Sequence, residues 1–196
     1  MPFVNEAARE LNVKIAYWGP PLGGKTTNLQ RLYDDAPAPT KGRLTNVATE
    51  TERALFFDVR SSLPPIRGYA LRFHVYTVPG SVYNAASYRT LLHGASGVVF
   101  VADSQFERLE ANLEQLDLLG ELLRANGESP ATMPIVLQHN KRDLPNVAST
   151  RLLDRILAVG QRPSFATCAR LGNGVQVTFD ACAQAVHAEL VRGGRR

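Results

Sequence analysis

One eight-residue stretch constrains the fold of this chain most, because it fits the pattern of a phosphate-binding loop, G-x-x-x-x-G-K-[ST]. It reads Gly19-Pro20-Pro21-Leu22-Gly23-Gly24-Lys25-Thr26. The apolar residues 13–18 before it predict a buried strand, and residues 26–34 after it predict a helix with Leu29 and Leu32 facing inward. Between a strand and a helix, the N–H groups of such a loop point into one concavity at the positive end of the helix dipole. The stretch therefore predicts a polyphosphate site.

The side chains and glycines of this loop have separate predicted roles. Lys25 is expected to reach the β- and γ-phosphates, and the Thr26 hydroxyl is expected to bind Mg²⁺. Gly23 and Gly24 leave room for the backbone to approach the phosphates. The alternative is a chance match in an ordinary Gly/Pro turn, which the flanking strand and helix disfavour. The predicted phosphate contacts are Gly19, Pro20, Leu22, Gly23, Gly24, Lys25, Thr26 and Thr27.

A second polar motif, Asn140-Lys141-Arg142-Asp143, follows directly after a predicted buried strand at residues 135–139. A carboxylate under a purine accepts two parallel hydrogen bonds from guanine N1–H and its 2-amino group, which adenine does not offer. The wrong base would leave the Asp143 carboxylate unpaired, so discrimination is strong. Lys141 is expected to lie along the base with its aliphatic stem, and Asn140 to tie this loop to the phosphate loop. The alternative is an ordinary polar turn.

The segment Thr167-Cys168-Ala169-Arg170 ends the last predicted strand and completes the base pocket. The Ala169 amide is the expected donor to guanine O6. Ligands of open α/β sheets bind at the carboxyl ends of the strands, where all three motifs stand. We therefore predict a site for GTP and GDP, with base contacts from Asn140, Lys141, Asp143, Cys168, Ala169 and Arg170.

The hydrophobic pattern predicts an α/β fold of the P-loop NTPase class, a three-layer sandwich with helices on both faces of its sheet. The sheet is expected to be mostly parallel and six-stranded, with one antiparallel strand. Residues 1–11 are expected either to add a short edge strand or to fold over the first helix. The predicted strands are 13–18, 55–60, 69–78, 97–103, 134–139 and 164–168, and the predicted helices are 26–34, 106–124, 151–158 and 176–191.

Length, charge and cysteine content limit the type of protein. A chain of 196 residues can bury a core without disulfides, and a net charge of +4 spread along it does not indicate a nucleic-acid surface. Two cysteines, Cys168 and Cys182, are too few for a disulfide framework and suggest a reducing cytosol. We expect a monomeric, cytoplasmic single domain over residues 1–191 and a basic disordered tail over residues 192–196.

The sequence predicts no direct membrane anchor. No apolar run approaches the length that spans a bilayer, and residues 1–11 lack a basic segment followed by a hydrophobic stretch. Residues 191–196 contain no cysteine for prenylation. Neither secretion nor direct membrane attachment is therefore expected.

These motifs resemble those of the small Ras-like GTPases over nearly the whole chain, and most closely those of the MglA branch, which acts in bacterial motility and polarity. Residues 77–80, Thr-Val-Pro-Gly, stand in place of the usual D-x-x-G and are characteristic of that branch. The matching segments are residues 19–20, 24–28, 48–50, 52–53, 55–58, 73–74, 76–80, 83–85, 97–104 and 140–145.

The resemblance implies a small-GTPase domain over residues 1–191 that works as a GTP/GDP switch with Mg²⁺. It implies a role in motility and cell polarity, with enrichment at a cell pole. The implied partners are a roadblock-fold activator of the MglB type, an exchange factor, and polarity and motility effectors. Nucleic acid is not among them.

Three positions depart from the family pattern. Ser81 stands where Ras-like proteins carry the glutamine that orients the attacking water, and its shorter side chain is not expected to hold that water in line. Ala54 stands where MglA relatives carry threonine in the first switch. Pro21 replaces a glycine of the phosphate loop, which removes one backbone donor.

The resemblance also implies further site residues. Arg53 is the candidate intrinsic arginine finger, so Arg53 and Ser81 are the positions expected to decide catalysis. The Gly80 amide is expected to sense the γ-phosphate, which orders two switch segments at about residues 41–53 and 79–90. The candidate Mg²⁺ ligands beside Thr26 are Asp58, in place of the aspartate that Thr77 displaces, and Thr49 or Thr51.

Two functions stay open at this stage. One is a GTPase switch with slow intrinsic hydrolysis, in which Arg53 stabilises the transition state. The other is a hydrolysis-deficient, GTP-bound scaffold that acts by recruiting partners, which the serine at position 81 favours. A third reading, an ATP-dependent kinase of the same loop class, is disfavoured by Asp143 and by the absence of a segment long enough for a substrate lid.

Overall fold

The computed structural model describes residues 2–48, 53–79, 85–157, 160 and 162–193. The described strands are β1 (Phe3–Asn5), β2 (Glu10–Trp18), β3 (Thr45–Ala48), β4 (Arg53–Arg60), β5 (Ala70–Thr77), β6 (Ala95–Asp103), β7 (Ile135–Asn140) and β8 (Ser164–Ala166). The α-helices are α1 (Lys25–Asp35), α2 (Ala85–Leu92), α3 (Leu109–Ala125), α4 (Thr150–Ile156) and α5 (Val175–Gly193). Two short 3₁₀ helices are η1 (Phe106–Arg108) and η2 (Ala169–Leu171).

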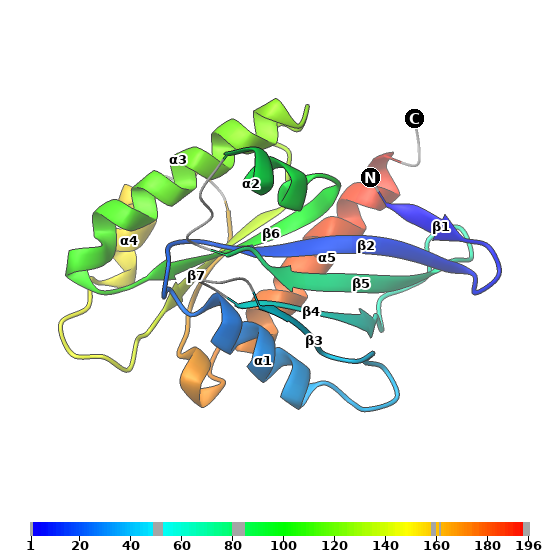
Figure 1. The fold of residues 1–196 in the computed structure, drawn as a ribbon, viewed down its shortest axis with the longest axis horizontal. Helices are drawn as coiled ribbons and strands as arrows, with labels where there is room; N and C mark the ends of the chain where they lie inside the picture. The colour runs from blue at the N-terminus through cyan, green and yellow to red at the C-terminus, as the bar shows by residue number, and fades with distance from the viewer. Residues whose placement is uncertain (1, 49–52, 80–84, 158–159, 161, 194–196) are drawn as a thin grey trace.

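The strands form one sheet in the order β3-β4-β5-β2-β6-β7-β8, with β1 paired to β2 (Figure 1). Strands β5, β2, β6, β7 and β8 are parallel, and β4 is antiparallel to β5. This confirms the predicted mostly parallel α/β sheet and its hairpin. The carboxyl ends of β2, β6 and β7 consequently meet at one edge of the sheet, which is where the predicted binding motifs stand.

The sheet has eight strands among the described residues instead of the six predicted, because β1 and β3 also pair. Strand β1 is antiparallel to the start of β2, from Phe3 opposite Asn12 to Asn5 opposite Glu10. It pairs with the same edge of β2 that pairs with β6 from Lys14 onward. Both added strands are short, and β1 is exposed along its whole length, so β1 lacks the alternating burial that reveals a strand in sequence.

Two apolar layers hold the helices to the sheet, and β6 contributes side chains to both layers. Val99 and Val101 face α1 and α5 on one side, whereas Val98 and Phe100 face α2 and α3 on the other. Successive side chains of a strand point to opposite faces, so a strand covered on both faces is apolar throughout. Figure 1 shows these two helical layers on opposite sides of the sheet.

Helix α5 extends two residues beyond its predicted end at residue 191 and runs through Gly193. The predicted disordered tail at residues 192–196 therefore starts too early, and residues 194–196 lie outside the described part of the chain. Arg192 pairs with Glu189, one turn before it, at 2.6 Å, which supports the last turn. No helix among the described residues is long and apolar enough to cross a membrane.

Gly97 is the point at which α5 packs most closely on β6. A Cβ atom there would lie 2.5 Å from Val186 Cγ2 and 3.1 Å from Cys182 Sγ. We expect Gly97→Ala to lower the free energy of unfolding by about 1–3 kcal/mol, because overpacking forces the helix away from the strand. Urea unfolding followed by the fluorescence of Trp18, the single tryptophan, would measure this.

The matched control is Gly120→Ala in the middle of α3, where a Cβ would meet only the flexible Arg124 side chain, at 3.6 Å or more. This variant is expected to be neutral or more stable by up to about 1 kcal/mol, because alanine restricts the unfolded chain. Equal stability of the two variants would contradict the close contact between α5 and β6.

Candidate functional site

The phosphate loop connects β2 to α1 through an alternation of left-handed residues. Gly24 is the residue before α1 and has φ 100°, and Leu22 has φ 60° with its side chain 86 % exposed. Alternating left- and right-handed residues turn successive N–H groups to the same side, which forms an anion-binding concavity. A Cβ at Gly24 would lie 2.2 Å from Asn140 Nδ2, so a larger residue would push this loop away from its neighbour.

The Lys25 side chain folds back over this loop. Its Nζ donates to the carbonyl oxygens of Gly19, at 2.9 Å, and Pro20, at 2.8 Å. The side chain is buried despite its charge. An ammonium group bonded to these two carbonyl oxygens can exchange them for phosphate oxygens, and phosphate is the stronger, charge-assisted acceptor.

Asn140 joins three loops through one buried side chain. Its Nδ2 donates to Gly23 O at 2.9 Å, and its Oδ1 accepts from Ala169 N at 3.0 Å and from Thr167 Oγ1 at 3.3 Å. The predicted tie between the base loop and the phosphate loop is therefore present. The third loop, which carries Ala169, is held by the same amide.

Asp143 has two polar neighbours in the base loop region. The Cys168 thiol donates to its carboxylate, and Arg170 Nη2 lies 3.2 Å from Asp143 Oδ2. The thiol and, secondarily, Arg170 hold the pKa of Asp143 below its ordinary value, so the carboxylate is an ionised acceptor at neutral pH. Burial and the hydrogen bond to Asp143 raise the pKa of the Cys168 thiol, which keeps the donated proton on sulfur.

These loops enclose a cleft with a volume of about 460 Å³. Eight of the predicted nucleotide contacts line it together with Leu144. They are Leu22, Gly24, Thr27, Asn140, Lys141, Asp143, Ala169 and Arg170. A larger cavity of about 540 Å³ lies between α1, β4 and α5, and its described lining contains none of the predicted site residues. The cleft is therefore the candidate site.

Asp58 does not lie with the other predicted Mg²⁺ ligand, Thr26. Its carboxylate binds the guanidinium of Arg72, on the adjacent strand β5. In the β4–β5 ladder Asp58 pairs with His74. His74 lies three residues before Thr77, which ends β5 next to the phosphate loop. At roughly 3.3 Å per residue, that places it about 10 Å back along the strand. The structure consequently does not support the predicted Mg²⁺ role of Asp58.

Thr26 fits a metal ligand better, because its side chain is exposed in the first turn of α1, next to the loop. Mg²⁺ in phosphate sites takes few protein ligands, a hydroxyl or a carboxylate, and completes its shell with phosphates and water. Among the described residues no three His, Cys, Asp or Glu side chains form a metal-binding group.

Several predicted residues lie outside the described part of the chain. They are Thr49, Thr51, Gly80 and Ser81. Arg53 begins β4 and its backbone pairs with Ala48, but its side chain is not described. The catalytic predictions for Arg53 and Ser81 therefore remain predictions.

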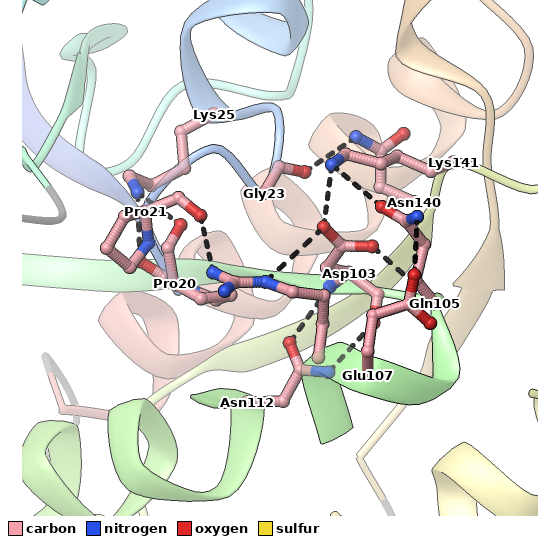
Figure 2. A network of polar contacts seen from close by, with 12 residues as sticks. Pro20, Pro21, Gly23, Lys25, Asp103, Gln105, Glu107, Asn112, Asn140 and Lys141 are labelled. Atoms are coloured by element: carbon pink, nitrogen blue, oxygen red, sulfur yellow. Dashed lines mark hydrogen bonds and ion pairs between the residues drawn. The ribbon is translucent and has the colours of Figure 1, made fainter. Parts of the chain in front are cut away.

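Sequence reasoning missed a charged network beside the loop (Figure 2). Asp103, at the end of β6, is buried and accepts from Lys141 Nζ at 2.6 Å. Arg108 Nη2 donates to Pro21 O at 2.9 Å. The available signal was the position of Asp103, because a carboxylate at the carboxyl end of a buried parallel strand belongs to the ligand-binding edge of the sheet.

Comparison with known proteins places the chain among characterised relatives. It is 48 % identical over 195 residues to the mutual gliding-motility protein MglA of Myxococcus xanthus (strain DK1622), covering 99 % of this chain and 100 % of that protein. It is 27 % identical to human ADP-ribosylation factor-like protein 4A, over 83 % of this chain and 77 % of that one. With ADP-ribosylation factor-like protein 6 of Caenorhabditis elegans the identity is 26 %, over 92 % and 88 % of the two chains. No protein-family model matches the chain.

The contacts of Asn140 predict a large loss on truncation. Asn140→Ala leaves the buried Gly23 carbonyl and Ala169 amide without a partner, at about 1–3 kcal/mol each. We expect the free energy of unfolding to fall by about 2–4 kcal/mol in chemical denaturation. Asn126→Ala is the control, because its side chain bonds Arg89 at the surface, and it should cost less than about 1 kcal/mol. Equal losses would show that Asn140 does not hold the three loops.

Proposed function

This chain belongs to the MglA family of Ras-like small GTPases, and on that premise we propose that it is a guanine-nucleotide switch that binds GTP and GDP with Mg²⁺ and hydrolyses GTP slowly. The observation that carries the proposal is the cleft in which the phosphate loop and Asp143 face the same space, tied together by Asn140. A polyphosphate site and a guanine acceptor in one cleft match one ligand class.

The binding roles follow from the contacts of each group. Lys25 exchanges the carbonyl oxygens of Gly19 and Pro20 for the β- and γ-phosphates, and Thr26 supplies a hydroxyl to Mg²⁺, which neutralises phosphate charge. The ionised Asp143 accepts from guanine N1–H and its 2-amino group. The remaining contacts that we propose are Pro20, Leu22, Gly23, Gly24, Thr27, Gly80, Asn140, Lys141, Cys168, Ala169 and Arg170.

Hydrolysis is proposed to depend on Arg53 and to be limited by Ser81. An arginine stabilises the charge that develops on the transferred phosphoryl group, whereas a serine at position 81 is too short to orient the attacking water as glutamine does. Thr49 or Thr51 is proposed as a further Mg²⁺ ligand from the first switch segment. The γ-phosphate would order residues of about 41–53 and 79–90, which partners then recognise.

A role in motility and cell polarity is proposed from the relative that is 48 % identical, whose name is mutual gliding-motility protein. The proposed partners are a roadblock-fold activator of the MglB type, an exchange factor, and motility and polarity effectors. A cytoplasmic location with enrichment at a pole is proposed, and the two free, buried cysteines, Cys168 and Cys182, suit a reducing compartment.

Base recognition is tested with Asp143→Asn. The asparagine amide offers one acceptor and one donor to a guanine edge that presents two donors, so one pairing is lost and a donor faces a donor. We expect GDP affinity to fall at least about tenfold, in competition against a fluorescent GDP analogue. Asp117→Asn, on the exposed face of α3, is the control and should bind like the parent. Binding of GDP by Asp143→Asn at the parent's affinity would refute the assignment of the base pocket.

Catalysis is tested by single-turnover GTP hydrolysis with Mg²⁺. We expect a slow parent rate that falls on the order of 10³-fold in Arg53→Ala, the scale of an arginine finger, and that rises in Ser81→Gln. Arg151→Ala, on exposed α4, is the control. A parent that binds GTP without turnover, with hydrolysis restored by Ser81→Gln, would establish instead a hydrolysis-deficient scaffold. The serine at position 81 is the observation that favours this second candidate.

A further inference from the structure

Arg108 connects the phosphate loop to the base loop although it belongs to neither. It is the residue that precedes α3, and its Nη2 donates to Pro21 O at 2.9 Å. Its Nε lies 4.0 Å from Asp103 Oδ2, the oxygen that also accepts from Lys141 Nζ at 2.6 Å. In Figure 2, Asp103 lies between Lys141 and the Pro20–Pro21 segment. The buried Asp103 carboxylate thus links Arg108, which contacts the phosphate loop, to Lys141 of the base motif.

Asp103 is held in place through both its backbone and its carboxylate. Asn112 in α3 accepts from Asp103 N at 2.9 Å and donates to Asp103 O at 2.8 Å. Gln105 N donates to Asp103 Oδ1 at 3.1 Å. Because Asn112 anchors the first turn of α3 to the end of β6, the place of Arg108 at the start of that helix is also set. The contact at Pro21 therefore comes from a rigid element instead of a flexible surface side chain.

The phosphate loop has a particular need for such a contact at this residue. Pro21 has no N–H group, so the loop offers a bound phosphate one donor fewer than it would with glycine there. The next residue, Leu22, is held in the left-handed region, which is strained for leucine. A guanidinium on the Pro21 carbonyl fixes that turn and polarises the peptide group whose N–H belongs to Leu22. The charge also favours an anion in the loop.

We propose that Arg108 is a positioning residue for nucleotide binding, which holds the phosphate loop at Pro21 in the conformation that receives the β-phosphate. Through Asp103 it couples that loop to Lys141 of the base motif. The proposal rests on the guanine-nucleotide function proposed above and assigns to Arg108 a contribution to the binding of the β-phosphate. Arg108 does not touch the reacting atoms.

The test compares affinities for GDP and GMP, measured by competition against a fluorescent GDP analogue. In Arg108→Gln we expect the affinity for GDP to fall about tenfold, the scale of one hydrogen bond to a charged group. The affinity for GMP should stay within about twofold, because GMP lacks the β-phosphate that the loop holds. A twofold change in affinity corresponds to less free energy than one hydrogen bond contributes. A contribution to folding alone would lower both affinities together.

Two further variants complete the test. Arg124→Gln, at the far end of α3, is the control and should keep the parent's ratio of GDP to GMP affinity. Arg108→Lys keeps the charge but cannot bond Pro21 and face Asp103 with separate nitrogens, so its ratio should lie between those of the parent and Arg108→Gln. An unchanged ratio in both Arg108 variants would overturn the inference. A parent that binds neither nucleotide would overturn the proposed function instead.

Discussion

The site depends on the buried side chain of Asn140, because the phosphate loop, the base loop and the loop that carries Ala169 all meet there. Each of these segments follows a different strand, so a contact between them is needed to fix their relative positions. An amide is suited to the junction since it both donates and accepts, whereas a carboxylate could not donate to Gly23 O. Its burial keeps water from competing for these bonds. The shape of the cleft thus depends on the contacts of Asn140 between the loops more than on any one motif.

The cationic side chains around the cleft contact backbone carbonyl oxygens and one buried carboxylate. Lys25 and Arg108 bind three successive carbonyl oxygens, of Gly19, Pro20 and Pro21. Carbonyl oxygens hold a cation in place without neutralising it, so these contacts add positive potential near the phosphate loop. At the other end, Asp143 keeps its charge through the Cys168 thiol, which suits a base that presents two donors. The cleft therefore has a carboxylate acceptor at one end and the phosphate loop at the other.

The predictions that proved correct came from residues whose role is local. A buried strand such as residues 97–103 is apolar on both faces, so its own residues reveal it. The structure does not support the Mg²⁺ role of Asp58, and the reason is non-local. Its position is set by the register of β4 on β5, which pairs Asp58 with His74. In that register the Asp58 carboxylate forms an ion pair with Arg72. The strand β1 was left open because its residues are exposed and carry no periodic signal.

By itself, the sequence determined the parallel sheet, the loop pattern between β2 and α1, and the place of the motif at residues 140–143 at a strand end. These follow from chemistry within a few residues of each other along the chain, where periodicity and turn residues act. Only the tertiary structure decided which charges meet. Arg108 and Pro21 are 87 residues apart in the chain, and Lys141 and Asp103 are 38 apart. Contacts of this kind depend on how α3 and the strand ends pack, because a side chain's neighbours across the sheet are set by packing and leave no pattern in the local sequence.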